Sequence, residues 1–274
     1  MIGIDVSCWQ NGLSLEKNKE YLDFIIMKAT EGVGFVDKCL SNFAVQSTEL
    51  GLLQGCYHFA RPDLHGTVDT MEDEAEWFVN TVEKNGLLGK AILVLDWETE
   101  PINREDLILA WLGKVLQLTG IKPFIYGSKS MLSSNTFKNL LNNWPIWMAA
   151  WPSTNFRTIE TAKSWVKNYS PTRTTVPWVI WQFSNTGILR GAGMHVDLNW
   201  TDMTPTDWMR LTGYEYIGSE TGKEIITDDM QWAIDMGIFN GKGDGTYGVK
   251  DVLTKEQIAT VLRRYYNAIA ADFS

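Results

Sequence analysis

Two acidic residues stand two positions apart in a very apolar segment of the chain. Asp96 and Glu98 occur in the run AILVLDWET. Residues two apart in a β-strand point to the same face, with Cα atoms roughly 6.5–7 Å apart, so we expect both carboxyls in one cavity and Trp97 turned outward. Two carboxyls that share a cavity cannot both ionise easily, and the raised pKa leaves one of them a proton donor at neutral pH. Cleavage of a glycosidic bond needs such a donor together with a second carboxylate.

Two further acids lie inside apolar runs elsewhere in the chain. Asp5 occurs in IGIDVS and Asp197 in HVDLNW. A buried charge costs several kcal/mol unless it is paired or required for function. A salt-bridge network with Lys28, Arg61 or Arg190 is the structural alternative. Four acids drawn from three separate apolar segments favour a functional site.

Metal and cofactor chemistry has weaker support in the sequence. Clustered acids can also hold Mg²⁺ for phosphoryl transfer or hydrolysis, and composition alone leaves that route open. The chain contains no GxxxxGK[ST] loop and no GxSxG elbow. We expect no cofactor, no metal and buried free thiols, with pairing of Cys39 and Cys56 in an oxidising setting as the alternative. The residues without metal-ligand or CxxC spacing are His58, His65, His195, Cys8, Cys39 and Cys56.

The elements that must position the acids follow from hydrophobic patterning. Residues 39–50, 69–84 and 104–118 space apolar residues three and four apart, which predicts helices. Strands and helices that alternate predict an α/β fold with a parallel sheet, and eight strands in about two hundred residues predict a barrel with its active site at the strands' C-terminal ends. Weak helical signal between the last three strands predicts an irregular second half. The eight β-like runs begin at Ile2, Phe24, Leu52, Ala91, Lys122, Pro145, Val179 and His195.

Charge and hydropathy exclude several classes of partner. A formal net charge of −9 opposes tight binding to nucleic acid, which requires clustered cations. No apolar run reaches the ~18 residues that cross a bilayer, so we expect no membrane partner. The N-terminal MIGIDVSCWQ has neither the basic region nor the long apolar region of a signal peptide, which predicts synthesis in a cytoplasm.

Several motifs occur in order along residues 1–203: GIDVSCWQNG, MKATEG, GLLQGCYHFARP, VLDWE, FIYGS, and WQFSNTG with HVDLNW. Together they resemble glycoside hydrolase family 25. These enzymes are muramidases of the Chalaropsis type, and many are bacteriophage endolysins. The resemblance implies an irregular, flattened (β/α) barrel that cleaves the β-1,4 bond from N-acetylmuramic acid to N-acetylglucosamine in peptidoglycan.

The resemblance also implies roles for particular residues. It makes Glu98 the general acid, and Asp96 the residue that assists attack by orienting the 2-acetamido group or a water. Asp5 and Asp197 match the two flanking acids that shape the charge of the site. The positions that match a sugar-binding cleft are Tyr57, Tyr126, Trp181 and Gln182.

The composition changes after residue 203, where TPTDW and GSETG mark a linker. We therefore expect a catalytic barrel over residues 1–203, a linker over 204–222 and a small α-helical module over 223–274. The module lacks the alternating acidic ligands of an EF-hand, so calcium is not expected. Its GIFNGKGDGTYG and LTKEQIATVLRR resemble one surface-layer-homology motif, a module that attaches proteins to secondary cell-wall polymers of Gram-positive bacteria.

A single copy of such a module departs from the usual three and has little core of its own. It is expected either to pack on the barrel or to self-associate with copies from other chains. Lys255, Arg263 and Arg264 are candidates to meet an anionic wall polymer, with a solvated helix face as the alternative.

Together these observations predict an antimicrobial, endolysin-type muramidase with peptidoglycan as substrate and a wall polymer as partner. It is expected to act at the bacterial cell wall after release from the host cytoplasm. The alternatives are a non-catalytic protein that binds wall glycan and a glycosidase of chitin-like polymers. The stereochemical course depends on the separation of the carboxyls, which the sequence does not supply.

Overall fold

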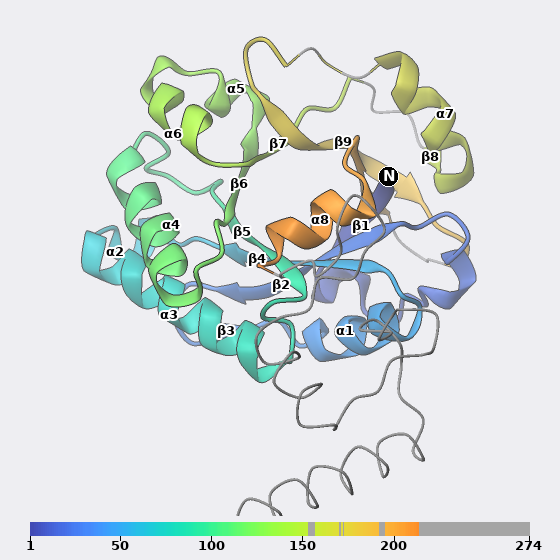
Figure 1. The fold of residues 1–274 in the computed structure, drawn as a ribbon, viewed down its shortest axis with the longest axis horizontal. Coiled ribbons are helices and arrows are strands. Elements are labelled where there is room, and N and C mark those ends of the chain that lie inside the picture. The colour runs from blue at the N-terminus through green and yellow to red at the C-terminus, as the bar shows by residue number, and fades with distance from the viewer. Residues whose placement is uncertain (153–156, 170, 172, 192–194, 214–274) are drawn as a thin grey trace, which may run out of the picture. The chain divides into compact units, whose positions relative to one another are not determined.

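The computed structural model describes residues 1–213, apart from 153–156, 170, 172 and 192–194. Within this part, eight strands form a closed barrel in the order β1-β2-β4-β5-β6-β7-β9-β10, closed by pairing of β10 with β1 (Figure 1). The strands are Ile2–Val6 (β1), Phe24–Glu31 (β2), Leu53–Phe59 (β4), Ala91–Asp96 (β5), Phe124–Ser128 (β6), Ile146–Ala149 (β7), Trp178–Ile188 (β9) and Val196–Thr201 (β10). Two short strands, Phe35–Val36 (β3) and Arg157–Thr158 (β8), pair with β2 and β9. The predicted α/β barrel is confirmed.

Helices cover the outside of the barrel (Figure 1). The three predicted amphipathic helices are confirmed as Leu40–Glu49 (α1), Val68–Lys84 (α3) and Glu105–Thr119 (α4). The helix α3 begins where the Thr67 hydroxyl accepts from the Thr70 amide, and α4 ends at Gly120, whose φ of 69° suits glycine. The other helices are Pro62–His65 (α2), Lys129–Leu132 (α5), Lys138–Asn143 (α6), Ile159–Tyr169 (α7) and Pro205–Leu211 (α8). Of the two connections between the last three strands, for which the sequence predicts weak helical character, the first contains the eleven-residue α7, whereas the second consists only of residues 189–195.

The last barrel strand corrects the expectation of a wholly parallel sheet. β10 runs antiparallel to both of its neighbours, β9 and β1. Only residues 189–195 join β9 to β10, and a parallel connection needs a crossover of a dozen or more residues. β10 therefore begins at the barrel end where the other strands finish. Asp197, its second residue, lies opposite Asp5 in the β1–β10 ladder for this reason.

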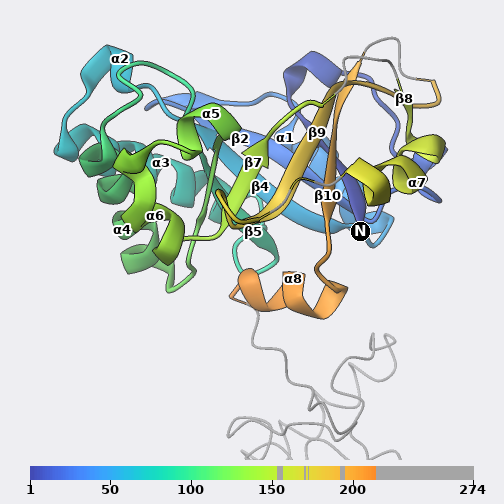
Figure 2. The ribbon, with the colours of Figure 1, turned by 90° about the horizontal axis from the view of Figure 1, so that it is seen from above.

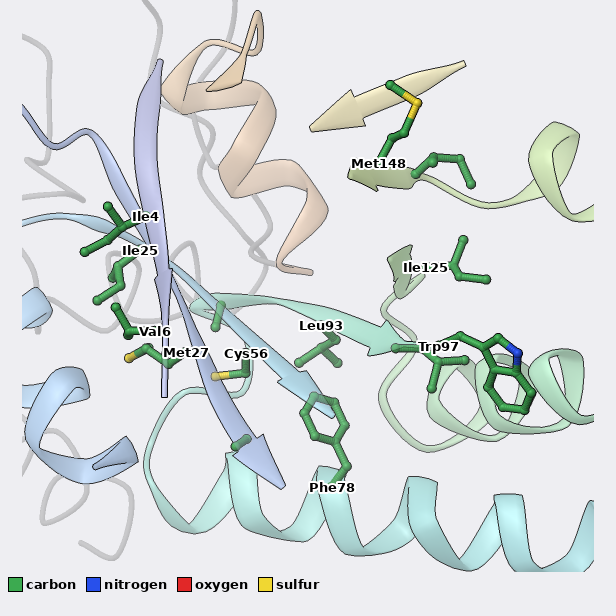
Figure 3. Close-up of a cluster of buried hydrophobic side chains, with 14 of the residues drawn as sticks. Ile4, Val6, Ile25, Met27, Cys56, Phe78, Leu93, Trp97, Ile125 and Met148 are labelled. Atoms are coloured by element: carbon green, nitrogen blue, oxygen red, sulfur yellow. The ribbon is translucent and has the colours of Figure 1, made fainter. Parts of the chain in front are cut away.

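Two layers of core follow from the alternation of side chains along each strand. One layer lies between the strands and the helices, where Phe78 reaches from α3 toward the strands and Trp97 is fully buried, turned outward as predicted (Figure 3). The other layer fills the inside of the barrel. It consists of Phe24, Ile26, Ile92, Val94, Phe124, Tyr126, Trp147, Ala149, Ile180 and Trp208.

The helix α8 closes the barrel end where the parallel strands begin, as Figure 2 shows below the strands. Trp208 is fully buried, with its ring 4.7 Å from that of Phe24 and its Nε1 donating to the Gln54 carbonyl at 3.0 Å. The linker predicted over residues 204–222 therefore starts too early. The polar TPTDW segment is a helix start, because the Thr204 hydroxyl and the Asp207 carboxylate form a reciprocal cap.

The chain divides into two compact units, Met1–Tyr214 and Glu215–Ser274, and the fold above is that of the first. The predicted helical module over 223–274, with its basic residues, lies outside the described residues. The three cysteines are free thiols, so Cys39 and Cys56 are not bonded to each other. In the part of the chain that the structure describes, no helix has the length and apolar character to span a bilayer.

Candidate active site

Asp5 and Asp197 meet at the open end of the barrel, held by two amide side chains. Asp5 Oδ2 accepts from Asn199 Nδ2 at 2.6 Å and from Gln182 Nε2 at 3.0 Å. Gln182 Nε2 also lies 3.4 Å from Asp197 Oδ2. Burial raises the pKa of Asp5 to about 6, although the N–H groups of Asn199 and Gln182 oppose the shift. Burial and then the charge of Asp5 raise the pKa of Asp197 to about 8. At neutral pH, Asp5 therefore carries the charge and Asp197 keeps its proton.

Asp96 and Glu98 enter the same end from β5. Asp96 is the last residue of this strand and is buried, and its Oδ1 has no hydrogen-bond partner among the described residues. Burial and the charge of Glu98 raise the pKa of Asp96 well above its ordinary value. Glu98 itself is exposed, yet nearby protein atoms partly desolvate its carboxyl, and this and the charge of Asp5 raise its pKa. Raised pKa values in both groups are the shift expected for carboxyls in one cavity.

The salt-bridge alternative does not hold for these four acids. Lys28 pairs with Glu31 at 2.7 Å, and Arg61 pairs with both Glu31 and Asp63. Arg190 lies against Glu20 and Glu160. Among the described residues, none of the four site acids has an ion-pair partner within 4.0 Å. Four clustered acids without such ion-pair partners, of which Asp5 and Asp96 are buried, cost stability, which favours a chemical role.

An aromatic wall lies beside the acids inside the barrel. The rings of Tyr57 and Tyr126 lie 6.3 Å and 4.4 Å from that of Trp147. Burial, and then the charge of Asp5, raise the pKa of Tyr57 well above its ordinary value. The Trp147 Nε1 donates to Asn199 Oδ1 at 2.8 Å, which orients the amide that binds Asp5. Both tyrosines proposed from the sequence therefore reach the site.

Trp181 does not reach the site, contrary to the expectation from the motif WQFSNTG. It is fully buried in the outer layer, with its Nε1 donating to the Ala150 carbonyl and its ring 5.6 Å from Phe183. Consecutive strand residues point to opposite faces, so Trp181 and Gln182 cannot both face the cavity. The structure assigns the inward position to Gln182.

Gln182 reaches the site in a different capacity from the one expected. Its Oε1 accepts from Tyr126 Oη at 2.9 Å and from Trp151 Nε1 at 3.1 Å, while its Nε2 contacts Asp5 and Asp197. Protein groups thus occupy both lone pairs and both N–H groups of this amide. Gln182 holds the acids in place and has no hydrogen-bonding group left for a sugar.

Three residues of the site were not predicted from the sequence: Trp147, Trp151 and Asn199. Their signal is the period of two along a strand. Asn199 follows Asp197 by two residues. Trp151 follows Ala149 by two residues and Trp147 by four, and both of these face the barrel interior.

Comparison with protein families agrees with this geometry. Residues 4–192 match the model of glycosyl hydrolases family 25, and residues 222–259 match the S-layer homology domain. The chain belongs to glycosyl hydrolases family 25. It is therefore a glycoside hydrolase of the lysozyme class, as the motifs indicated.

Individual relatives cover most of the chain. It is 30% identical over 207 residues to the protein YegX of Escherichia coli K12, spanning 72% of this chain and 68% of that protein. It is 29% identical over 209 residues to lysozyme M1 of Streptomyces globisporus, spanning 72% of this chain and 66% of that protein.

Solved structures share the fold of the barrel. The bacterial lysozyme from Streptomyces coelicolor aligns with a TM-score of 0.62 at 23% identity, covering 77% of this chain and 96% of that one. The catalytic domain of endolysin ply40 from bacteriophage P40 of Listeria monocytogenes also aligns with a TM-score of 0.62, at 22% identity, covering 78% and 97%.

Proposed function

We propose that this hydrolase cleaves the β-1,4 bond between N-acetylmuramic acid and N-acetylglucosamine in peptidoglycan, with Glu98 as proton donor. The observation that carries the proposal is the pairing of an exposed carboxyl, Glu98, with a buried one, Asp96, at the open end of the barrel. A donor must touch the glycosidic oxygen, and only the exposed member of this pair can do so. Burial and the charge of Asp5 raise its pKa, which favours the protonated form that a donor needs.

Asp96 is suited to a supporting part. Its buried Oδ1 lacks a hydrogen-bond partner, so it can accept one from a substrate group brought beside Glu98. We assign it the orientation of the 2-acetamido group or of the attacking water. The bond to the leaving oxygen breaks as Glu98 gives up its proton, and positive charge develops on the sugar ring.

Asp5 and Asp197 are assigned the stabilisation of that positive charge. Asp5 is the acid best supplied with N–H donors, and its negative charge is present in the site before the reaction begins. A fixed charge that requires no reorganisation is the most effective kind of transition-state stabilisation. Asp197, which keeps its proton, acts through Asp5 across the strand pair.

The rival functions make different products. A barrel that only bound wall glycan gains nothing from a cluster of four acids, two of them buried, that destabilises it. A glycosidase of chitin-like polymers needs the same acids, so substrate profiling separates it from a muramidase. Purified peptidoglycan treated with the full chain is expected to gain reducing ends of muramic acid. New ends of glucosamine alone, or none at all, contradict the proposal.

We further propose that the C-terminal region binds a secondary cell-wall polymer of a Gram-positive bacterium, which makes the whole chain an endolysin-type enzyme that acts at the wall after release. The match of residues 222–259 to the S-layer homology domain supports this partner, and self-association of that region is the way we propose a single copy completes a binding unit. Residues 1–213 alone are expected to cleave soluble glycan normally but to sediment less with purified walls. Equal sedimentation of the two chains contradicts the targeting role.

A further inference from the structure

Trp151 lies beside the acid site with its ring partly exposed to solvent and its Nε1 bonded to Gln182. It follows β7 by two residues and is 47% exposed, while its Nε1 donates to Gln182 Oε1 at 3.1 Å. Because the nitrogen edge is held by the protein, the exposed surface is the carbon part of the ring. A flat aromatic face beside a polar cavity is the surface on which a sugar ring packs.

The same indole fixes which way the Gln182 amide points. Oxygen and nitrogen of an amide exchange places by a half turn, and that turn would set Oε1 against the carboxylate of Asp5. The Tyr126 hydroxyl can rotate to accept instead of donate, so it tolerates either orientation. An indole N–H can only donate. Trp151 is therefore the contact that makes the turned amide unfavourable.

The orientation matters because the Gln182 nitrogen donates toward two acids. These N–H groups favour the charged form of Asp5, which has no ion-pair partner within 4.0 Å among the described residues. The titratable groups that interact with this pair are Asp96, Glu98, Tyr57 and Tyr126, and Lys28, from β2, acts on Asp96. Lys28 is occupied with Glu31, which leaves the amides as the groups that hold the charge of Asp5.

We propose that Trp151 is both the platform for a pyranose ring of the glycan and the positioning residue for the Gln182 amide. The inference rests on the proposed function, because it places a sugar of that substrate next to the acids. One side chain then links the seating of the glycan to the charge of Asp5.

Two substitutions separate the two parts of the proposal. Trp151→Ala removes ring and N–H together, whereas Trp151→Phe keeps an aromatic face and removes only the N–H. With soluble peptidoglycan fragments and the full chain, Trp151→Ala is expected to raise KM roughly tenfold. Trp151→Phe is expected to leave KM within about twofold and to move the rising limb of the kcat profile about half a unit to higher pH.

Trp77→Phe is the matched control. Trp77 on α3 also donates its Nε1 to an oxygen at 3.0 Å, the Phe35 carbonyl, outside the acid site. Its substitution is expected to change neither KM nor the pH profile. A Trp151→Phe profile that overlays that of the unmodified enzyme overturns the positioning role, and an unchanged KM in Trp151→Ala overturns the platform. Trp151→Leu replaces Trp151→Ala if the latter fails to fold.

Affinity measured in a Glu98→Gln background keeps the inference apart from the proposed function. Calorimetry with soluble glycan then reports binding without turnover. A roughly tenfold loss of affinity on adding Trp151→Ala supports the platform even if Glu98→Gln turns out to remain active, which overturns only the donor assignment. Unchanged affinity overturns the platform even if Glu98 proves to be the donor.

Discussion

Asp5 and Asp197 are partners in the ladder that joins the first strand of the barrel to the last. The Gln182 amide contacts both acids and the Asn199 amide contacts Asp5 alone, and the pKa is raised to about 6 for Asp5 and to about 8 for Asp197. The charge of this acid pair therefore depends on the closure of the barrel by β1 and β10. Each member of the pair gives a prediction that differs from that of Glu98.

Substitution of the proposed donor is expected to abolish turnover without harming the fold. Glu98→Gln keeps the shape of an exposed side chain and removes the proton, so kcat should fall by roughly 10²–10⁴-fold. Reducing ends released from purified walls measure the loss, and thermal unfolding checks the fold. Glu49→Gln, on the exposed end of α1, is the control. A folded Glu98→Gln enzyme that clears walls at the normal rate contradicts the assignment.

Activity should rise as Asp5 ionises. Its pKa of about 6 predicts that kcat increases as the pH rises through that value, and the loss of the Glu98 proton ends the increase. Asn199→Ala removes one of the N–H groups that favour the charged form, which raises the pKa of Asp5 further. The rising limb should therefore move to higher pH. An unmoved limb in a folded variant indicates that Asp5 does not control it.

Stability should fall as the pH rises across the neutral range. Asp5 and Asp197 have folded-state pKa values of about 6 and about 8, against an ordinary value of 3.8. Unfolding therefore releases protons at pH values between 3.8 and about 8. Their favourable contribution is fully present below about pH 4 and is lost as the pH rises toward 8. Asp197→Asn should flatten this decline in the melting temperature, whereas Asp69→Asn on exposed α3 should leave it unchanged. An equal decline in both variants argues against the assignment.

The closure of the barrel end where the parallel strands begin should depend on Trp208. Its indole fills the interior beside Phe24, and Trp208→Ala is expected to lower the free energy of unfolding by about 3–5 kcal/mol. Urea unfolding measures the loss. Trp208→Phe keeps most of the packing and loses mainly the bond to Gln54, so it should cost less. A cost below about 1 kcal/mol for Trp208→Ala places α8 outside the cooperative unit of the barrel.

The sequence predicts the barrel well because its strands are buried on both faces and read as apolar runs. The sequence also predicts that Asp5, Asp96, Glu98 and Asp197 lie at one end of the barrel, because each is an acid inside such a run. Contacts between distant segments are harder to predict. Gln182 and Asp5 are separated by 177 residues, and no local pattern reveals that this amide is saturated by Tyr126 and Trp151.

Two errors had signals in the sequence itself. Trp181 and Gln182 are neighbours in a strand, so only one of them can face the cavity, and the motif alone does not decide which. The runs that begin at Val179 and His195 stand too close in the sequence for a strand and a crossover between them, and in the structure only seven residues join β9 to β10, which makes the last strand antiparallel. Trp208 is different, because its polar surroundings in TPTDW are typical of a linker and only packing shows its burial.

The pairing of β1 with β10 also determines at which point in its synthesis a chain can become an active hydrolase. Asn199 and Asp5 lie 194 residues apart and bond directly, so the acid site is incomplete until nearly the whole barrel has been synthesised. Contacts of such long range form late and slowly in folding. A fragment released early from the ribosome therefore has no assembled acid cluster, and lytic potential arises only in a chain whose barrel is complete.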